Sequence, residues 1–302
     1  MLFTASKDNS PNVWYSHNGE RLGTFNGHNG SIWSLDVTGD SRMLLSGSAD
    51  ATAKIWDVSC GKLVNTLTTK TSVRSVDYSM GDKELLLATD AKMGHAAELQ
   101  IYSMADLTKP LRTVVVSGSR PTVAYWSDCN RFIITGHDDG SLCRWNPSTG
   151  EKIEVSKIHS AYITDLQFSK CGTYFISSSK DHTAKLVDCK SFEIKKTFKT
   201  ERPVNSASIS PIRDEVVLAG GQEADKVTTT STRAGKFEAR FFNAVFEDEI
   251  GRVKGHFGPI NTIAYHPRGI GFASGAEDGY VRIHEFDKEY YSFNYADHII
   301  AK

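Results

Sequence analysis

The chain has no long apolar run. None of its hydrophobic stretches approaches the roughly 18 residues that a membrane-spanning helix requires. Its first residues contain neither the basic segment nor the apolar segment of a secretory signal. We therefore expect a protein that has no membrane partner and is localised in the cytoplasm.

Paired cysteines and an excess of charge are also missing. The five cysteines are odd in number and none has C-x-x-C spacing, which favours free thiols in a reducing compartment over a disulfide framework. The formal net charge is −1, whereas proteins that bind phosphate backbones usually present a basic field. The composition therefore predicts no direct nucleic-acid partner.

The motifs of several common enzyme classes are absent as well. The sequence has no G-x-x-x-x-G-K-[ST] loop and no dinucleotide fingerprint. Its 10 histidines are scattered, and none belongs to an H-x-x-x-H pair with a glutamate partner. These absences predict no catalytic residue, no cofactor and no metal site.

What the chain does contain is a repeat, which is clearest in residues 27–57. Asp50 lies four residues after Ser46, six before Trp56 and twenty-two after His28. The offsets to the histidine and the hydroxyl residue recur in two further sets: His159, Ser177 and Asp181, and His256, Ser274 and Asp278. With weaker units included, seven second strands succeed one another at a period near the 40–45 residues that are typical of WD40 repeats.

This repeat predicts an all-β fold, a seven-bladed WD40 β-propeller with an incomplete first blade. Residues 1–295 are expected to form a single propeller and residues 296–302 a C-terminal tail. Blade one begins at its second strand, so its innermost strand is missing. We expect the open edges to favour self-association, and residues 290–295 are the candidate for an outer strand of blade seven.

Two connections are longer than their counterparts in the other units. Both join the second strand of a blade (b) to its third (c), and they comprise residues 91–98 and 222–236. In a propeller these b–c connections emerge on the same face as the d–a connections, which lead from the outermost strand of one blade to the innermost strand of the next. Loops on a rigid scaffold often carry function, so this face is the expected interaction face.

The repeated histidine, serine and aspartate contain the elements of a catalytic triad. A hydrolase, however, needs one activated nucleophile beside an oxyanion site. A set that recurs in several blades is better interpreted as a structural hydrogen-bond network. The predicted members are His28, Ser46, Asp50, Trp56, His159, Ser177, Asp181, His256, Ser274 and Asp278.

Several segments lie outside the general WD40 consensus. They are VWYSHNGERLGTF at 13–25, GGQEA at 220–224, VTTTS at 227–231, GKFEARF at 235–241 and EIGRVKGHFGP at 249–259. These segments closely resemble the family of the i subunit of eukaryotic translation initiation factor 3, and the resemblance covers essentially the whole chain. Members of that family begin earlier, with an outer strand and the innermost strand of blade one.

The resemblance implies a non-catalytic scaffold in a multi-subunit complex that joins the small ribosomal subunit during initiation. It also implies two direct partners, a C-terminal helix of the b subunit and the g subunit, and an indirect association with the small ribosomal subunit. The alternative is another WD40 adaptor, for instance in a signalling complex. The unusual block at 220–259 favours the initiation-factor interpretation.

A partner site is predicted on blade six. Glu201 lies twenty-two residues before Glu223, which is the slot that His28 occupies before Asp50. Asp225 comes next in the long b–c connection, so these acids are expected on one face, with Val227 as an apolar anchor. We expect this acidic patch to receive basic residues of the b-subunit helix. The alternative is a solvated acidic loop.

Overall fold

The computed structural model describes residues 1–221, 237–293 and 295. The residues fall into two compact units, Met1–Ile163 and Thr164–Lys302, which are described separately. Residues 296–302, the predicted tail, lie outside the described residues, and a single propeller domain over 1–295 remains a prediction.

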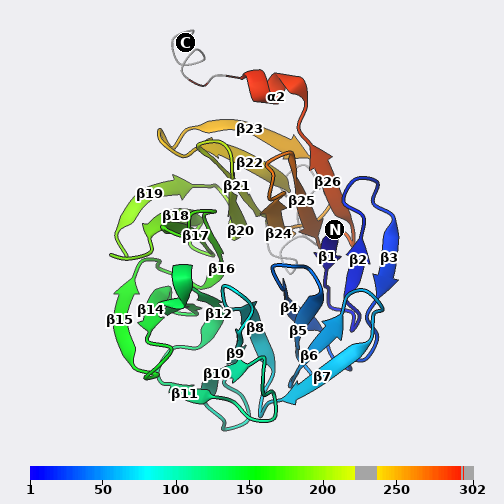
Figure 1. Ribbon diagram of the computed structural model, residues 1–302. Helices are drawn as coiled ribbons and strands as arrows, with labels where there is room; N and C mark the ends of the chain where they lie inside the picture. The colour runs from blue at the N-terminus through cyan, green and yellow to red at the C-terminus, as the bar shows by residue number, and fades with distance from the viewer. Residues whose placement is uncertain (222–236, 294, 296–302) are drawn as a thin grey trace. The chain divides into compact units, whose positions relative to one another are not determined.

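Unit 1 contains four antiparallel sheets that form blades one to four (Figure 1). Blade one comprises β1 (Leu2–Thr4), β2 (Asn12–Trp14) and β3 (Arg21–Thr24). Blade two comprises β4 (Ile32–Val37), β5 (Met43–Ser48), β6 (Thr52–Asp57) and β7 (Leu63–Thr68). Blade three comprises β8 (Val73–Tyr78), β9 (Glu84–Thr89), β10 (Ala97–Ser103) and β11 (Arg112–Val116). Blade four comprises β12 (Pro121–Trp126), the 3-10 helix η1 (Asp128–Asn130), β13 (Ile133–His137), β14 (Ser141–Trp145) and β15 (Lys152–Lys157).

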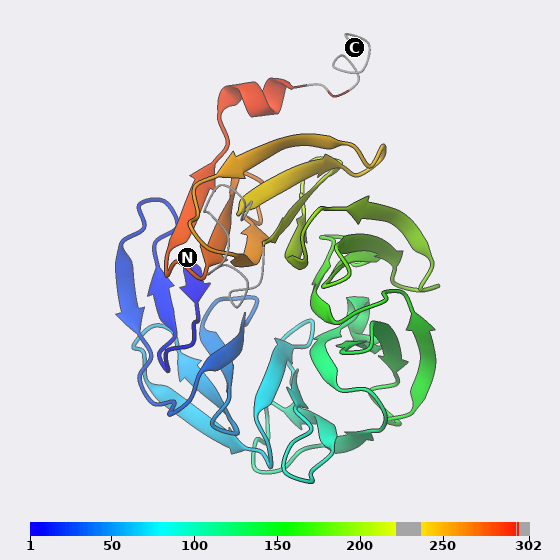
Figure 2. The same cartoon turned by 180° about the vertical axis from the view of Figure 1, so that it is seen from behind.

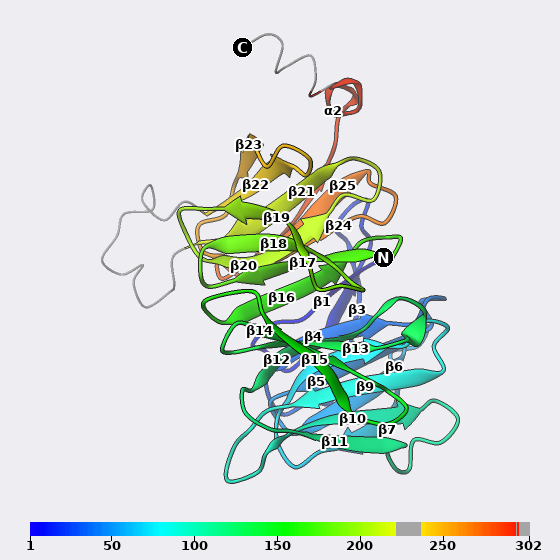
Figure 3. The same cartoon turned by 90° about the vertical axis from the view of Figure 1, so that its left-hand side faces the viewer.

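Blades five to seven come next and are coloured from green to red in Figure 2. The first strand of blade five, β16, starts on the last residue of unit 1. Blade five comprises β16 (Ile163–Phe168), β17 (Tyr174–Ser179), β18 (Thr183–Asp188) and β19 (Ile194–Lys199). Blade six comprises β20 (Val204–Ile209), β21 (Glu215–Gly220), β22 (Glu238–Asn243) and β23 (Glu249–Lys254). Blade seven comprises β24 (Ile260–Tyr265), β25 (Gly271–Ala276) and β26 (Val281–Glu285), and the helix α2 (Lys288–Ser292) comes after it. Figure 3 shows neighbouring strands of blade six, β20 to β22, from the side.

The predicted all-β, seven-bladed propeller with a small first blade is therefore confirmed. Among the described residues, blade one has three strands, in the order β1-β2-β3, and no strand equivalent to β4 or β8. Blade seven also has three strands among the described residues, in the order β24-β25-β26. The long connection of blade three is found between β9 and β10 and includes a bridge between Lys92 and His95. The other, residues 222–236, lies outside the described residues.

The expectation of an outer strand at residues 290–295 is wrong, because Lys288–Ser292 forms α2. Asp287 caps this helix, and its carboxylate accepts a hydrogen bond from the backbone N–H of Tyr290. The Tyr290 ring stacks on Phe286 at 3.8 Å, and its hydroxyl donates to Glu215 over 2.7 Å. Contacts with residues outside the segment thus determine its helical conformation, although its aromatic residues by themselves favour a strand.

Burial within each blade decreases from the inner strands to the outermost one. The second strands β5, β9 and β17 are buried at every position after the first, because packing against both faces covers them. The outer strand β15 instead has exposed and half-buried residues. Between blades three and four, Leu86 and Leu99 pack in one cluster with Trp126 and Trp145. Strands of this kind give each blade a rigid frame on which the connections are mounted.

Side chains of the innermost strands also bond to the next blade. Within unit 1, the Ser75 hydroxyl donates to the Ala124 carbonyl and accepts from the Ala124 N–H, both over 3.1 Å. Within unit 2, Asp165 accepts hydrogen bonds from the Ser206 hydroxyl over 2.6 Å and from the Gln167 amide over 3.1 Å. Burial raises the pKa of Asp165 to about 6, although these bonds act in the opposite direction.

The raised pKa of Asp165 predicts that the contact between blades five and six contributes a pH-dependent stability. The folded state holds the Asp165 proton up to about pH 6, whereas the unfolded chain releases it near the ordinary pKa of 3.8. The stabilisation is therefore complete below the unfolded pKa and is lost as pH rises through the folded one. Asp165→Asn keeps a side chain of the same shape that is neutral at every pH, although its amide nitrogen cannot accept the bond that one of the two carboxylate oxygens accepts. We expect its stability relative to that of the wild type to rise by about 2–3 kcal/mol between pH 4 and pH 7, because only the wild-type carboxyl titrates with a different pKa in the two states.

Urea unfolding of both proteins across this pH range measures the effect. A stability difference that stays constant with pH would show that Asp165 does not titrate between the two states in this way.

Candidate functional site

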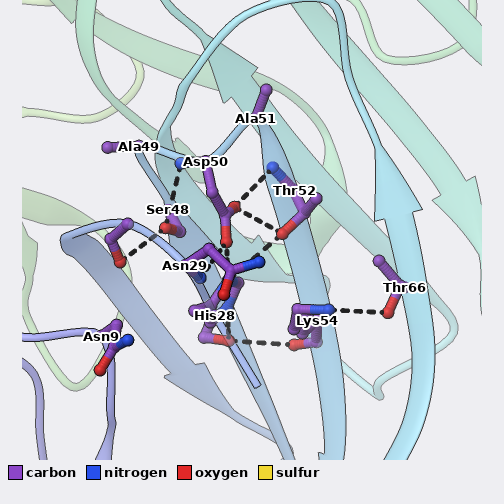
Figure 4. Close-up of polar contacts among 12 residues, drawn as sticks. Asn9, His28, Asn29, Ser48, Ala49, Asp50, Ala51, Thr52, Lys54 and Thr66 are labelled. Atoms are coloured by element: carbon purple, nitrogen blue, oxygen red, sulfur yellow. Dashed lines mark hydrogen bonds and ion pairs between the residues drawn. The ribbon is translucent and has the colours of Figure 1, made fainter. Parts of the chain in front are cut away.

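In blade two, a chain of hydrogen bonds joins the d–a connection to the second and third strands. Nδ1 of His28 lies 2.9 Å from the Asp50 carboxylate, and Nε2 lies 2.7 Å from the Ser46 hydroxyl. Nε1 of Trp56 donates to the same hydroxyl over 2.8 Å. Figure 4 shows His28 and Asp50 pointing toward each other from the connection and from the turn between β5 and β6. The structure therefore brings together all four residues of this set.

The protonation states result from these surroundings. Burial lowers the pKa of His28 against the opposing effect of Asp50, so the ring is neutral at neutral pH. Burial opposes ionisation of Asp50, but hydrogen bonds from Thr52, Asn29 and His28 outweigh it and lower the pKa. A neutral ring that donates from Nδ1 to Asp50 leaves Nε2 to accept from Ser46, whose oxygen in turn accepts from Trp56. Every donor in this arrangement has an acceptor.

The same geometry is unsuited to hydrolysis. Ser46 is 0% exposed and Trp56 is 1% exposed, so a substrate carbonyl has no access to the hydroxyl. A nucleophile must reach the reacting atom at a distance of about 3 Å. We therefore propose that the set stabilises the blade and does not catalyse a reaction.

Blade seven repeats most of this arrangement. Nδ1 of His256 lies 3.0 Å from the Asp278 carboxylate, and Nε2 lies 2.8 Å from the Ser274 hydroxyl. The same carboxylate accepts from the backbone N–H of Phe257 over 3.0 Å. At the position of Trp56 stands His284, which stacks on Phe272 at 4.6 Å. The structure thus brings together the three predicted residues of this blade.

The set of blade five is divided between the two units. Ser177 and Asp181 belong to unit 2 and His159 to unit 1, so the complete set remains a prediction. Within unit 2, the Ser177 hydroxyl donates to the Lys185 carbonyl over 3.3 Å. Asp181 accepts from the Thr183 hydroxyl over 2.6 Å, as Asp50 accepts from Thr52.

Blade four contains a variant that the repeat offsets did not predict. Nε2 of His137 lies 2.8 Å from the Thr135 hydroxyl, which also accepts from Trp145 over 2.9 Å. Nδ1 of His137 lies 3.1 Å from the Ser119 carbonyl. Here the histidine comes from β13 itself and not from the connection before the blade. Its spacing of two residues from Thr135 places both side chains on one face of a strand, and this signal could have identified it.

The predicted partner-binding residues are only partly described. Glu201 is exposed and precedes β20 in the d–a connection of blade six. Glu223, Asp225 and Val227 lie outside the described residues, so the acidic patch remains a prediction. Two residues after Glu201, the Pro203 carbonyl accepts from the Gly221 N–H over 3.3 Å. This bond holds the start of β20 beside the end of β21.

The described residues offer no metal cluster and no membrane span. No group of three or more histidine, cysteine, aspartate or glutamate side chains among them could hold a metal ion. In the same part of the chain, no helix has the length and apolar character needed to cross a membrane.

Comparisons with known proteins place the chain among named relatives. The family model EIF3I matches residues 1–296. A protein of Nematostella vectensis named eukaryotic translation initiation factor 3 subunit I is 50% identical over 291 residues, which cover 96% of this chain and 91% of the relative. A Schizosaccharomyces pombe protein of the same name is 49% identical over 303 residues, covering 98% and 92%. The Drosophila melanogaster protein is 50% identical over 298 residues, covering 96% and 91%.

Proposed function

Because this chain belongs to the family of eukaryotic translation initiation factor 3 subunit I, we propose that it is a non-catalytic scaffold of that factor. In this role it binds the b and g subunits while the small ribosomal subunit is recruited. The observation that carries the proposal is the extended match to relatives named as this subunit, at about half identity over nearly the full chain. Membership of the family supports a role in translation initiation.

The architecture supports a scaffold. Rigid blades present their connections as fixed binding elements, and His28 and Ser46 of the triad-like set in blade two are buried. A scaffold uses surface complementarity, which needs no activated nucleophile. The relevant surface is the face that carries the d–a and b–c connections.

We place the b-subunit helix at blade six. Glu201 is exposed on the d–a connection there, and Asp225 belongs to the long b–c connection of the same blade. Carboxylates at such a rim would pair with basic residues of a helix and set its orientation and association rate. An apolar contact from Val227 would then anchor the helix.

Reversing both charges tests this site. We expect the double variant Glu201→Lys, Asp225→Lys to bind a labelled peptide from the C-terminus of the b subunit about tenfold more weakly, because two attractive pairs become repulsive. Fluorescence anisotropy measures the dissociation constant, and thermal melting checks that the fold is unchanged.

A matched control is available in the same blade. Asp214 and Glu247 lie in the turns at the other end of its strands, before β21 and before β23. Asp214→Lys, Glu247→Lys changes the charge equally and should leave binding within about twofold. Equal dissociation constants for the wild type and the Glu201 variant would move the site to another blade. Failure of the wild type to co-purify with tagged b and g subunits would refute the proposed function itself.

A further inference from the structure

A cluster of cations surrounds Trp33 on the connection face of unit 1. The Arg74 guanidinium lies over the Trp33 ring at 3.6 Å from its centroid, and the Lys92 ammonium lies 5.4 Å from it. Trp33 and Arg74 are the second residues of β4 and β8, just after d–a connections. Lys92 lies in the long b–c connection of blade three, and Arg120 lies in the d–a connection before β12. These residues, Trp33, Arg74, Lys92 and Arg120, are termed the Trp33 cluster.

A buried carboxylate holds the cluster together. Asp90 accepts hydrogen bonds from Nε and Nη2 of Arg74 over 3.1 and 2.9 Å. The same carboxylate lies 3.6 Å from the Lys92 ammonium and 3.8 Å from Nη1 of Arg120. Arg120 also donates from Nε to Asp138 over 2.9 Å. Two carboxylates therefore orient three cations.

The charges are not exposed equally. The side chain of Asp90 is 2% exposed, whereas those of Arg74, Lys92 and Arg120 are 30%, 48% and 48% exposed. Asp138, at 26%, is also more covered than its partner Arg120. Three cations and two anions leave one net positive charge. The positive groups are the more exposed ones, so they form most of the solvent-accessible surface of the cluster. The net charge of the cluster is therefore positive, whereas the formal net charge of the whole chain is −1.

The two guanidinium groups retain unused donors. A guanidinium has five N–H groups, and Asp90 and Asp138 engage the Nε edges of Arg74 and Arg120. Among the residues that the structure describes, the other N–H groups of these two side chains have no hydrogen-bonded partner. Stacking on Trp33 and pairing with Asp90 fix Arg74 in place, so little conformational entropy remains to be lost when it binds an anion.

We propose that the Trp33 cluster binds an acidic segment of a protein partner, with a carboxylate placed between Arg74 and Arg120. Planar guanidinium groups match carboxylates in a bidentate geometry, and the exposed Lys92 adds a third contact. A nucleic acid fits less well, because phosphate backbones require an extended basic field and this one has three cations beside two carboxylates. The inference goes beyond the proposed function, and it concerns unit 1, whereas Glu201 belongs to unit 2.

Titration with a defined probe tests the proposal. The probe is a fluorescein-labelled peptide of alternating glutamate and leucine, and its binding to the full chain is monitored by fluorescence anisotropy at physiological ionic strength. We expect saturable binding that weakens as salt is raised. Arg120→Glu should weaken it at least about tenfold, because a bidentate contact is replaced by a repulsive charge. Lys92→Ala, a milder change in a surface connection, should weaken it about threefold without affecting the fold.

The control is Arg42→Glu. Arg42 is 84% exposed in the turn between β4 and β5, at the other end of these strands, and the charge change is identical. Binding by this variant should stay within about twofold of the wild type. Three results would overturn the proposal: no saturable binding by the wild type, equal weakening by Arg42→Glu, or equal binding of a peptide with glutamine in place of glutamate. Tighter binding of an oligouridylate than of the peptide would instead assign the cluster to phosphate.

Discussion

Replacing Asp50 with alanine is expected to lower the free energy of unfolding by about 2–3 kcal/mol, because a buried donor loses its charged acceptor. The Asp50 carboxylate accepts four hydrogen bonds: from His28, from the backbone of Asn29, and from the backbone and hydroxyl of Thr52. Without it, Nδ1 of His28 loses its acceptor in a ring that is 2% exposed. The ring is then no longer held in position for the hydrogen bonds that continue through Ser46 to Trp56.

Asp8→Ala is the matched control for this change. Asp8 has the same place in blade one, six residues before Trp14, whose indole donates to the Thr4 hydroxyl over 2.8 Å. Asp8 is exposed and accepts a bond from the backbone of Ser10 at 3.2 Å. We expect a loss of about 0.5 kcal/mol or less there, as for most surface changes. Urea unfolding of both variants gives the comparison, and equal losses would mean that Asp50 serves only as a turn residue.

Gly140→Ala is expected to have an effect of similar size, a loss of about 3–4 kcal/mol. Gly140 adopts φ +85° in the turn between β13 and β14, a conformation that favours glycine. A Cβ at this position would lie 2.3 Å from the His159 carbonyl oxygen and 2.8 Å from that of Ala161. Both atoms belong to the backbone, so no rotamer change can relieve the contact. The turn also accepts a bond from the His159 N–H over 3.0 Å, which the displacement would break.

Gly61 separates the two contributions. It adopts φ +67° in the turn between β6 and β7, and a Cβ there would meet no atom within 4 Å. Gly61→Ala therefore reports backbone strain alone, which costs about 1 kcal/mol. Thermal melting and urea unfolding of the two variants give the difference. If Gly61→Ala destabilised the protein as much as Gly140→Ala, the close contact of the connection before blade five with the Gly140 turn would not account for the loss.

The sequence alone determined the repeat and the positions that its register fixes. In blade two, Ser46 pairs with Lys54 and Leu44 pairs with Trp56 across β5 and β6. A fixed hairpin register converts constant sequence offsets from Asp50 into constant positions in space for Ser46 and Trp56. The same rule applied to β4 and β5, where Ile32 pairs with Ser48, places His28 just before β4. The same local rule, together with the non-consensus segments, identified the family and the number of blades.

Tertiary structure decided the features that depend on neighbours distant in the sequence. His137 replaces a connection histidine because its ring reaches the Thr135 hydroxyl and the Ser119 carbonyl at once. α2 forms where Arg213 donates to the carbonyls of Tyr290 and Phe293. The Trp33 cluster joins residues from three blades, and no single repeat contains its pattern. Offsets within a repeat encode contacts inside one blade, whereas contacts between blades depend on how separate repeats pack, and no local spacing records that.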